Sequence, residues 1–369
     1  EILALADFQR PPSVSLSPDK SWVLLSYRPT YKTLEELGQE EIRLAGLRIN
    51  AKTRISSTEN YFHNIRIRSA QDGKEYDIAG LPANALISNI SFSLDSKYIA
   101  FTHTNDSGVS LWVMDIAAKS AKQLTDYDLN AVLNDPYQWL RNSQGLLISK
   151  SPANRPALID HSKDLPTGPV VSTSEGKVSQ LRTYQDLLKN PQDEQDFVSL
   201  ATAELYWIDL QGQQTKFLSA DLYTQANVSP DGKYVLVSKL KKPFSYVVAY
   251  NSFPQEANVY AIDGSLEQKV NETPLMEIMP KGFSSTRPGK RMLTWRADKP
   301  NTLFFVQALD GGDASKPADF RDELFTWEYP FSAEPKSLTK VKDRFAGIIW
   351  GNDTYALVSS SWYDTRNSK

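Results

Sequence analysis

Few residues of this chain have the type and spacing that catalysis requires. A serine hydrolase of the α/β class carries its nucleophile in a Gly-x-Ser-x-Gly turn, and no such turn occurs in the 369 residues. The possible bases are His63, His103 and His161. His63 and His103 fall in predicted strands, which favours structural roles, and no histidine has metal-ligand spacing. We predict no catalytic residue, no metal and no cofactor in this stretch.

The elements that would position any site are short hairpins that recur along the chain. Each joins two apolar strands through a turn rich in Ser, Asp and Gly, because such turns need residues that tolerate a positive φ or bond their own backbone. The clearest copies lie at residues 14–25, 90–101 and 226–238, and weaker copies lie at 138–148, 294–305 and 349–358.

A third and a shorter fourth strand follow most of these hairpins. Four antiparallel strands that repeat in this order predict an all-β fold, a β-propeller of four-stranded blades. A β-sandwich with similar turns is the weaker alternative. Residues 1–12 form a lead-in, and residues 13–369 hold about five and a half blades. Because an open propeller would expose strand edges, we expect the natural protein to continue beyond Lys369.

Two insertions interrupt the predicted blades, at residues 29–62 and 151–200. In the first, residues 34–37 and 40–44 suggest a short helical piece that Gly46 ends. In the second, residues 183–190 could form a helix capped by Thr183, and residues 193–196 are interpreted as a solvated acidic loop. Long insertions of this kind are usually functional or disordered.

The composition excludes several classes of partner. The net charge is −3 and the sequence pI is about 5.8, so no electrostatic feature indicates nucleic acid or an anionic membrane. No apolar run is long enough for a membrane span. The chain has no cysteine, which excludes disulfides and thiolate metal sites. The absent cysteines and the start at Glu1 favour a bacterial periplasmic or secreted parent.

Several longer motifs carry a resemblance to a known family. In order, they lie at residues 44–49, 182–189, 293–303, 309–314 and 361–366. Together they resemble the N-terminal propeller of the prolyl oligopeptidase family of serine peptidases, and most closely its glutamyl endopeptidase branch. The resemblance implies a seven-bladed propeller followed by a C-terminal α/β-hydrolase domain, which carries the catalytic Ser, Asp and His. In that family the propeller restricts entry to small or unfolded peptides.

A peptidase that cuts after glutamate needs a cation for the substrate carboxylate. Arginine suits this task because its planar fork binds both carboxylate oxygens. The substrate-binding candidates on insertions or inter-blade loops are Arg48, Arg54, Arg287 and Arg291. For each, a surface salt bridge is the alternative role, and the hydrolase domain could supply the cation instead.

These observations predict a non-catalytic propeller that gates access of peptides to a serine endopeptidase site and contributes to the selection of glutamate. The expected partners are a peptide substrate and the hydrolase domain of the same protein. The competing hypothesis is a stand-alone envelope propeller that acts as a protein-interaction module, with residues 151–200 as its recognition element. A sugar-active propeller is less favoured, since few inward carboxylates occur on the predicted strands.

Overall fold

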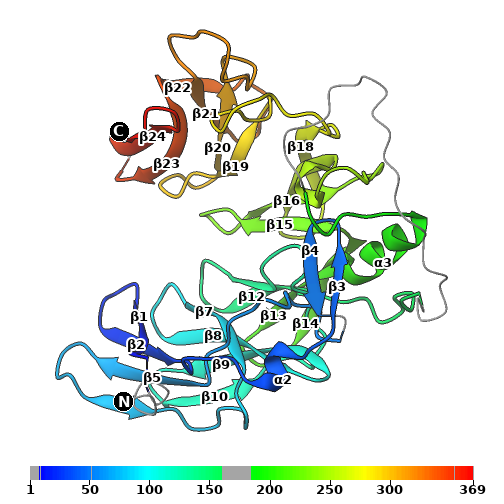
Figure 1. Ribbon diagram of the computed structural model, residues 1–369. Helices are drawn as coiled ribbons and strands as arrows, with labels where there is room; N and C mark the ends of the chain where they lie inside the picture. The colour runs from blue at the N-terminus through cyan, green and yellow to red at the C-terminus, as the bar shows by residue number, and fades with distance from the viewer. Residues whose placement is uncertain (1–7, 9, 51, 160–183, 353, 369) are drawn as a thin grey trace. The chain divides into compact units, whose positions relative to one another are not determined.

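The computed structural model describes residues 8, 10–50, 52–159, 184–352 and 354–368. These residues form mainly β-strands, and most of the strands belong to four-stranded antiparallel sheets (Figure 1). The predicted all-β fold with repeated four-stranded blades is therefore confirmed. The number of blades in a closed propeller stays a prediction.

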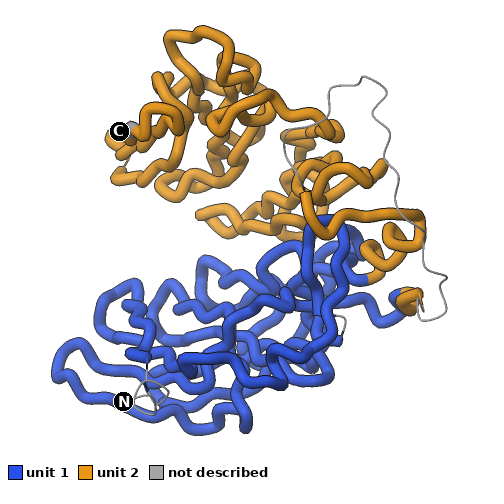
Figure 2. The backbone as a smooth tube through the Cα atoms, in the orientation of Figure 1, with its two compact units in different colours: residues 1–155, 200–223 blue, residues 156–199, 224–369 orange. Residues whose placement is uncertain are grey.

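The chain divides into two compact units, each described here by itself (Figure 2). Residues 1–155 and 200–223 form unit 1, which holds three four-stranded sheets. The first contains β1 (Ser13–Leu16), β2 (Trp22–Tyr27), β5 (Asn64–Ser69) and β6 (Glu75–Asp77); the second contains β7 (Ile87–Phe92), β8 (Tyr98–Asn105), β9 (Gly108–Asp115) and β10 (Ser120–Gln123); the third contains β11 (Tyr137–Trp139), β12 (Gly145–Lys150), β13 (Ala203–Asp209) and β14 (Gln214–Asp221).

Residues 156–199 and 224–369 form unit 2. Its described strands build two four-stranded sheets and one three-stranded sheet. The first contains β15 (Tyr223–Val228), β16 (Tyr234–Leu240), β17 (Gln255–Ala261) and β18 (Leu266–Thr273); the second contains β19 (Arg291–Trp295), β20 (Thr302–Ala308), β21 (Asp322–Glu328) and β22 (Lys336–Val341); the third contains β23 (Arg344–Trp350), β24 (Ala356–Trp362) and β25 (Asn367–Ser368). A short 3-10 helix, η2 (Tyr250–Ser252), precedes β17.

The repeated hairpins share one hydrogen-bonded turn. At Ser229, the hydroxyl donates to Asp231 at 2.6 Å and accepts the backbone N–H of Tyr234 at 3.0 Å. The same pair of bonds recurs at Ser17, with Asp19 and Trp22, and at Ser93, with Asp95 and Tyr98. The side chains thus satisfy backbone groups that a tight turn leaves unpaired, which is why this short pattern specifies a hairpin wherever it occurs.

Within each unit, these turns also link consecutive sheets. The backbone N–H of Asp19 donates to Ser96, and that of Asp95 donates to Ser143, so each turn bonds to the turn of the next sheet. Apolar side chains fill the space between the sheets: in unit 2, Leu236 and Val259 of one sheet cluster with Leu303 of the next. The core therefore lies between neighbouring sheets, as expected when each sheet buries both faces.

The first insertion is only partly helical. Residues Leu34–Leu37 form α2, and Thr33 caps it through a capping box with Glu36, as that local pattern predicts. The expected helical character of residues 40–44 is wrong, because Glu41–Leu44 (β3) pairs with Leu47–Asn50 (β4) in a hairpin. Ala45 and Gly46 both adopt a positive φ and form its turn, so Gly46 closes a hairpin rather than a helix.

The second insertion places its helix later than expected. The described residues 184–190 contain no helix, and α3 spans Pro191–Ala201. The Asn190 side chain accepts the N–H of Asp193 at 2.8 Å, which caps this helix, and Pro191 and two acidic residues occupy its first turn, a favourable start for a helix. The interpretation of residues 193–196 as a solvated loop is also wrong, because they lie in α3 and Asp196 is buried. Thr183 lies outside the described residues.

Candidate functional site

A polar cavity of about 380 Å³ lies in unit 2 between the sheet of β15–β18 and strand β19. Strands β15 to β18 all contribute amides or hydroxyls to its wall, including the amides of Gln225, Gln255 and Asn271. The segment before β19 contributes two cations, Arg287 and Lys290. None of the described residues that line this cavity is acidic, so its lining carries uncompensated positive charge.

Arg287 is the cation in this cavity that lacks a partner. Its side chain forms no hydrogen bond or ion pair within the part of the chain that the structure describes. Burial lowers the pKa of Arg287, and the positive charge of Arg291 lowers it further. A half-buried guanidinium without a counter-ion retains all five of its donors for a ligand. It can therefore bind a carboxylate in a fork geometry.

Lys290 is held more firmly. Its Nζ donates to the Val270 carbonyl at 2.8 Å and lies 4.2 Å from the centre of the Trp327 ring. Burial lowers its pKa, against the opposing effect of Glu334. The ammonium thus contributes charge to the wall of the cavity, while the carbonyl and the ring fix its position.

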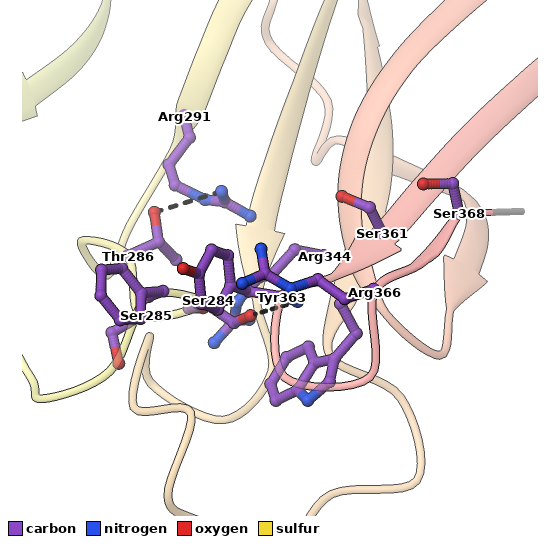
Figure 3. A pocket seen from close by; sticks show the side chains of 11 residues that line it. Ser284, Ser285, Thr286, Arg291, Arg344, Ser361, Tyr363, Arg366 and Ser368 are labelled. Atoms are coloured by element: carbon purple, nitrogen blue, oxygen red, sulfur yellow. Dashed lines mark hydrogen bonds between the residues drawn. The ribbon is translucent and has the colours of Figure 1, made fainter.

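A second cavity, of about 460 Å³, also contains arginines but differs in charge. Arg291, Arg344 and Arg366 line it together with Tyr363 and several hydroxyl residues (Figure 3). Figure 3 shows the hydrogen bond from Arg291 to the Thr286 hydroxyl, at 3.2 Å. Arg291 also lies 2.6 Å from the buried Asp322, as an ion pair that is poorly aligned for a hydrogen bond.

Arg344 is the centre of a buried charge network beside this second cavity. It donates to both carboxylate oxygens of Asp310 at 2.8 and 2.7 Å, to Asp322 at 3.0 Å and to the Ser284 carbonyl at 2.7 Å. Burial alone would raise the pKa of Asp310, but the hydrogen bonds from Arg344 and Arg321 outweigh it and leave the pKa lowered. Asp310 and Asp322 neutralise Arg344 and its neighbour Arg321. The network therefore has a structural role, which is to join β21, β23 and the loop at Asp310.

The two predicted residues of the first insertion lie in unit 1. Arg48 belongs to β4, pairs in register with Arg43 and helps to lower the pKa of Glu41, whose largest stabilising contact is the Ser57 hydroxyl. Arg54 follows the hairpin with a φ of 54°. Burial, and then the charge of Arg155, lower the pKa of Arg54 to about 10. Its Nε atom is buried and makes no hydrogen bond with the described residues.

The structure therefore separates the four predicted arginines by their charge environment. Arg48 and Arg291 have acidic neighbours, and Asp128 partly offsets the effects of burial and Arg155 on the pKa of Arg54. Among the described residues, no carboxylate acts on Arg287. Sequence reasoning missed Lys290, which lines the same cavity as Arg287, and Arg155, whose charge acts on Arg54. Lys290 stands three residues after Arg287, a proximity that could have suggested it. Nothing in the sequence indicated that Arg155 approaches Arg54.

No helix among the described residues combines the length and the apolarity that crossing a membrane requires.

Comparisons with known proteins give a consistent relationship. No family model matches the chain. A probable glutamyl endopeptidase, chloroplastic, of Oryza sativa subsp. japonica is 33% identical over 385 residues, covering 100% of this chain and 41% of that protein. The corresponding protein of Arabidopsis thaliana is 34% identical and is covered to 40%. The chain thus spans about two fifths of the length of these relatives. Their names give no support to a periplasmic or secreted location.

Solved structures are more distant. An acylaminoacyl peptidase in complex with Z-Gly-Gly-Phe-chloromethyl ketone matches 97% of this chain and 44% of its own, with a TM-score of 0.48 and 13% identity. A putative dipeptidyl aminopeptidase IV from Bacteroides ovatus matches 94% of this chain and 43% of its own, with a TM-score of 0.45 and 11% identity. The relationship rests on the sequence: along its whole length, this chain is similar to about two fifths of two probable glutamyl endopeptidases, the resemblance that its motifs predicted.

Proposed function

We propose that this chain is the non-catalytic, blade-forming part of a serine endopeptidase and that it helps to select acidic residues of the substrate through Arg287. The relationship to glutamyl endopeptidases supports the peptidase role. The observation that carries the selection is the guanidinium of Arg287, which has no counter-ion among the described residues and lies in a polar cavity whose described lining includes no acidic residue.

The chemistry of the cavity suits a glutamate side chain. A carboxylate would accept two parallel N–H bonds from Arg287, while Lys290 would add a second positive charge. The amide groups of Gln255 and Asn271 could hydrogen-bond the peptide backbone or the carboxylate,. Binding would also relieve the repulsion between Arg287 and Arg291, which lowers the pKa of Arg287 in the free protein.

In this proposal, the catalytic Ser, Asp and His belong to a C-terminal α/β-hydrolase domain, and the blades restrict which peptides reach it. Arg54, with Arg155 nearby, is the second candidate for an acidic group of the substrate. Arg48 and Arg291 are less suited, because neighbouring carboxylates already balance their charge.

The test compares Glu and Gln substrates in the full-length protein. Fluorogenic peptides that differ only in Glu or Gln before the scissile bond would be hydrolysed by the wild type and by Arg287→Met. Loss of a charged hydrogen bond of about 1.5–3 kcal/mol predicts a fall of about 10- to 150-fold in the preference for Glu in kcat/KM. Arg287→Lys should retain part of the preference, since it keeps the charge without the fork.

Arg366→Met is the matched control, since Arg366 is exposed and lies over the Tyr363 ring, 3.9 Å from its centre. It should leave the preference for Glu unchanged. An Arg287→Met protein that keeps the full preference would overturn the role of Arg287. A full-length protein without any fluorophosphonate-sensitive cleavage would overturn the peptidase role itself.

A further inference from the structure

A third cavity, of about 1010 Å³, lies entirely within unit 1. It is formed by α2, the start of β5, the segment before β7 and the turn that joins β8 to β9. Its volume is at the upper end of the range of about 300–1,000 Å³ that is typical of sites for organic ligands. None of the arginines considered for substrate selection lines it.

Three buried polar side chains line this cavity without a complete set of partners among the described residues: Thr53, His103 and Thr104. His103 is 4% exposed, and its Nε2 atom forms no hydrogen bond with the described residues. Thr53 is 5% exposed, and its Oγ1 atom is likewise unbonded within the described chain. A buried polar atom that lacks a partner costs about 1–3 kcal/mol. A polar ligand in the cavity would supply partners for such atoms.

His103 can adapt to the ligand. Its Nδ1 lies 2.9 Å from the Tyr127 hydroxyl. Burial lowers the pKa of His103 and so favours the neutral imidazole, although the Asn84 carbonyl acts in the opposite direction. If Nδ1–H donates to Tyr127, Nε2 becomes an acceptor. An N–H donor from a ligand would select this tautomer.

The charge of the lining restricts the ligand further. Glu35, Glu36 and Asp106 line the cavity, and none of the described residues that line it is Lys or Arg. Glu36 is already engaged, since it accepts the Thr33 N–H at 2.8 Å and lies 3.9 Å from His63. Glu35 and Asp106 are exposed. The lining thus repels anions and attracts cations, the opposite of the Arg287 cavity.

The wall also has an apolar part, which includes Trp112 and Leu86. Apolar surface next to acceptors and carboxylates suits a long side chain that ends in a cation, because its methylene groups and its charge can be accommodated together. We infer that this cavity binds a basic peptide segment, with a Lys or Arg side chain directed to its carboxylates and to His103. This site is separate from the proposed selection of glutamate.

The test measures peptide binding to the full-length protein by fluorescence anisotropy. The probes are a labelled Ala-Gly-Lys-Lys-Gly-Ala peptide and the same peptide with both lysines acetylated. The lysine peptide should bind at least about 10-fold more tightly, and its affinity should fall as salt is raised. The double variant Glu35→Gln/Asp106→Asn removes two exposed carboxylates and should weaken the lysine peptide by about 10-fold.

Asp77→Asn is the control, because Asp77 has an 83% exposed side chain and does not line the cavity. It should leave the affinity unchanged. His103→Gln, which retains a donor and an acceptor, should weaken binding less than His103→Ala. Equal affinity for the acetylated peptide, or an equal loss in Asp77→Asn, would overturn the inference. If the double variant Glu35→Gln/Asp106→Asn kept the wild-type affinity for the lysine peptide, the inference would also be overturned.

Discussion

Arg287 and Arg291 are four residues apart, yet their surroundings have opposite character. Arg287 lies in a cavity with polar, non-acidic walls, and its charge is uncompensated within the described chain. Arg291 lies 2.6 Å from Asp322, which Arg344 also binds at 3.0 Å. Arginine in itself therefore does not indicate a carboxylate site. The deciding feature is whether the fold supplies its own carboxylate or leaves the place for one from a ligand.

The largest contrast should appear in stability. Arg344→Met should lower the free energy of unfolding by about 3 kcal/mol, because it removes the hydrogen bonds that Arg344 donates to the buried Asp310 and Asp322,. Arg321 and Arg291 still contact these two carboxylates. Arg287→Met should change it by less than about 1 kcal/mol, since no buried partner loses its counter-ion. Urea denaturation of both variants measures the difference. Equal losses would contradict the distinction between the two arginines.

Gly312 packs against the backbone of Thr286 and Arg287. Thr286 lines the cavity of Arg291 and Arg344, and Arg287 lines the neighbouring polar cavity. A Cβ at residue 312, where φ is +81°, would lie 2.0 Å from the Thr286 carbonyl oxygen. Gly312→Ala should therefore cost roughly 2–4 kcal/mol and should also reduce the preference for Glu peptides, because Arg287 directly follows Thr286. Urea denaturation and the Glu/Gln comparison provide the two measurements. Gly311→Ala shares the positive φ but has open space around its Cβ apart from Lys316, so it should affect stability less and the preference hardly at all.

The charge network should also respond to acid. The pKa of Asp310 is lowered in the folded protein from the ordinary value of 3.8. Its contribution to stability is therefore complete above that value and is lost as the pH falls through the lower folded-state pKa. Urea denaturation between pH 2 and 6 should show a weaker acid dependence in Asp310→Asn than in the wild type, together with lower stability at pH 6. An unchanged acid dependence would show that other carboxylates govern it.

The smallest effect is expected at the rim of the second cavity. Arg366 is exposed and lies 3.9 Å from the centre of the Tyr363 ring. Arg366→Ala should cost only about 0.5–1 kcal/mol, the usual range for an exposed cation–π contact, as measured by thermal unfolding. A loss comparable to that of Arg344→Met would place Arg366 in the buried network.

The repeated hairpins were predictable because their information is local. Ser229, Asp231 and Tyr234 lie within six residues and make the turn by themselves, and the same holds for the copies at Ser17 and Ser93. The capping box of α2 is equally local. The prediction failed at residues 40–44 and 184–190, where strand pairing and a better cap at Asn190 outweighed modest helix propensity,.

The candidate site was predicted only in part. From the sequence, arginines before and at the start of β19 were predicted to bind a substrate carboxylate, and Arg287 and Arg291 were both candidates. It could not separate them, because Asp322 stands 31 positions after Arg291 and reaches it only when β19, β20 and β21 pair. The same limit applies to Arg155, whose charge acts on Arg54 although about 100 positions of the sequence separate them.

By itself, the sequence determined the hairpin repeat, the absence of thiol chemistry and the relationship to glutamyl endopeptidases, since these depend on residue types and short spacings. The tertiary structure decided which arginines are neutralised, which polar atoms remain unbonded and where cavities of opposite charge form. The physical reason is that ion pairing and burial act between side chains near in space, and the pairing of sheets brings together residues that lie far apart in the chain.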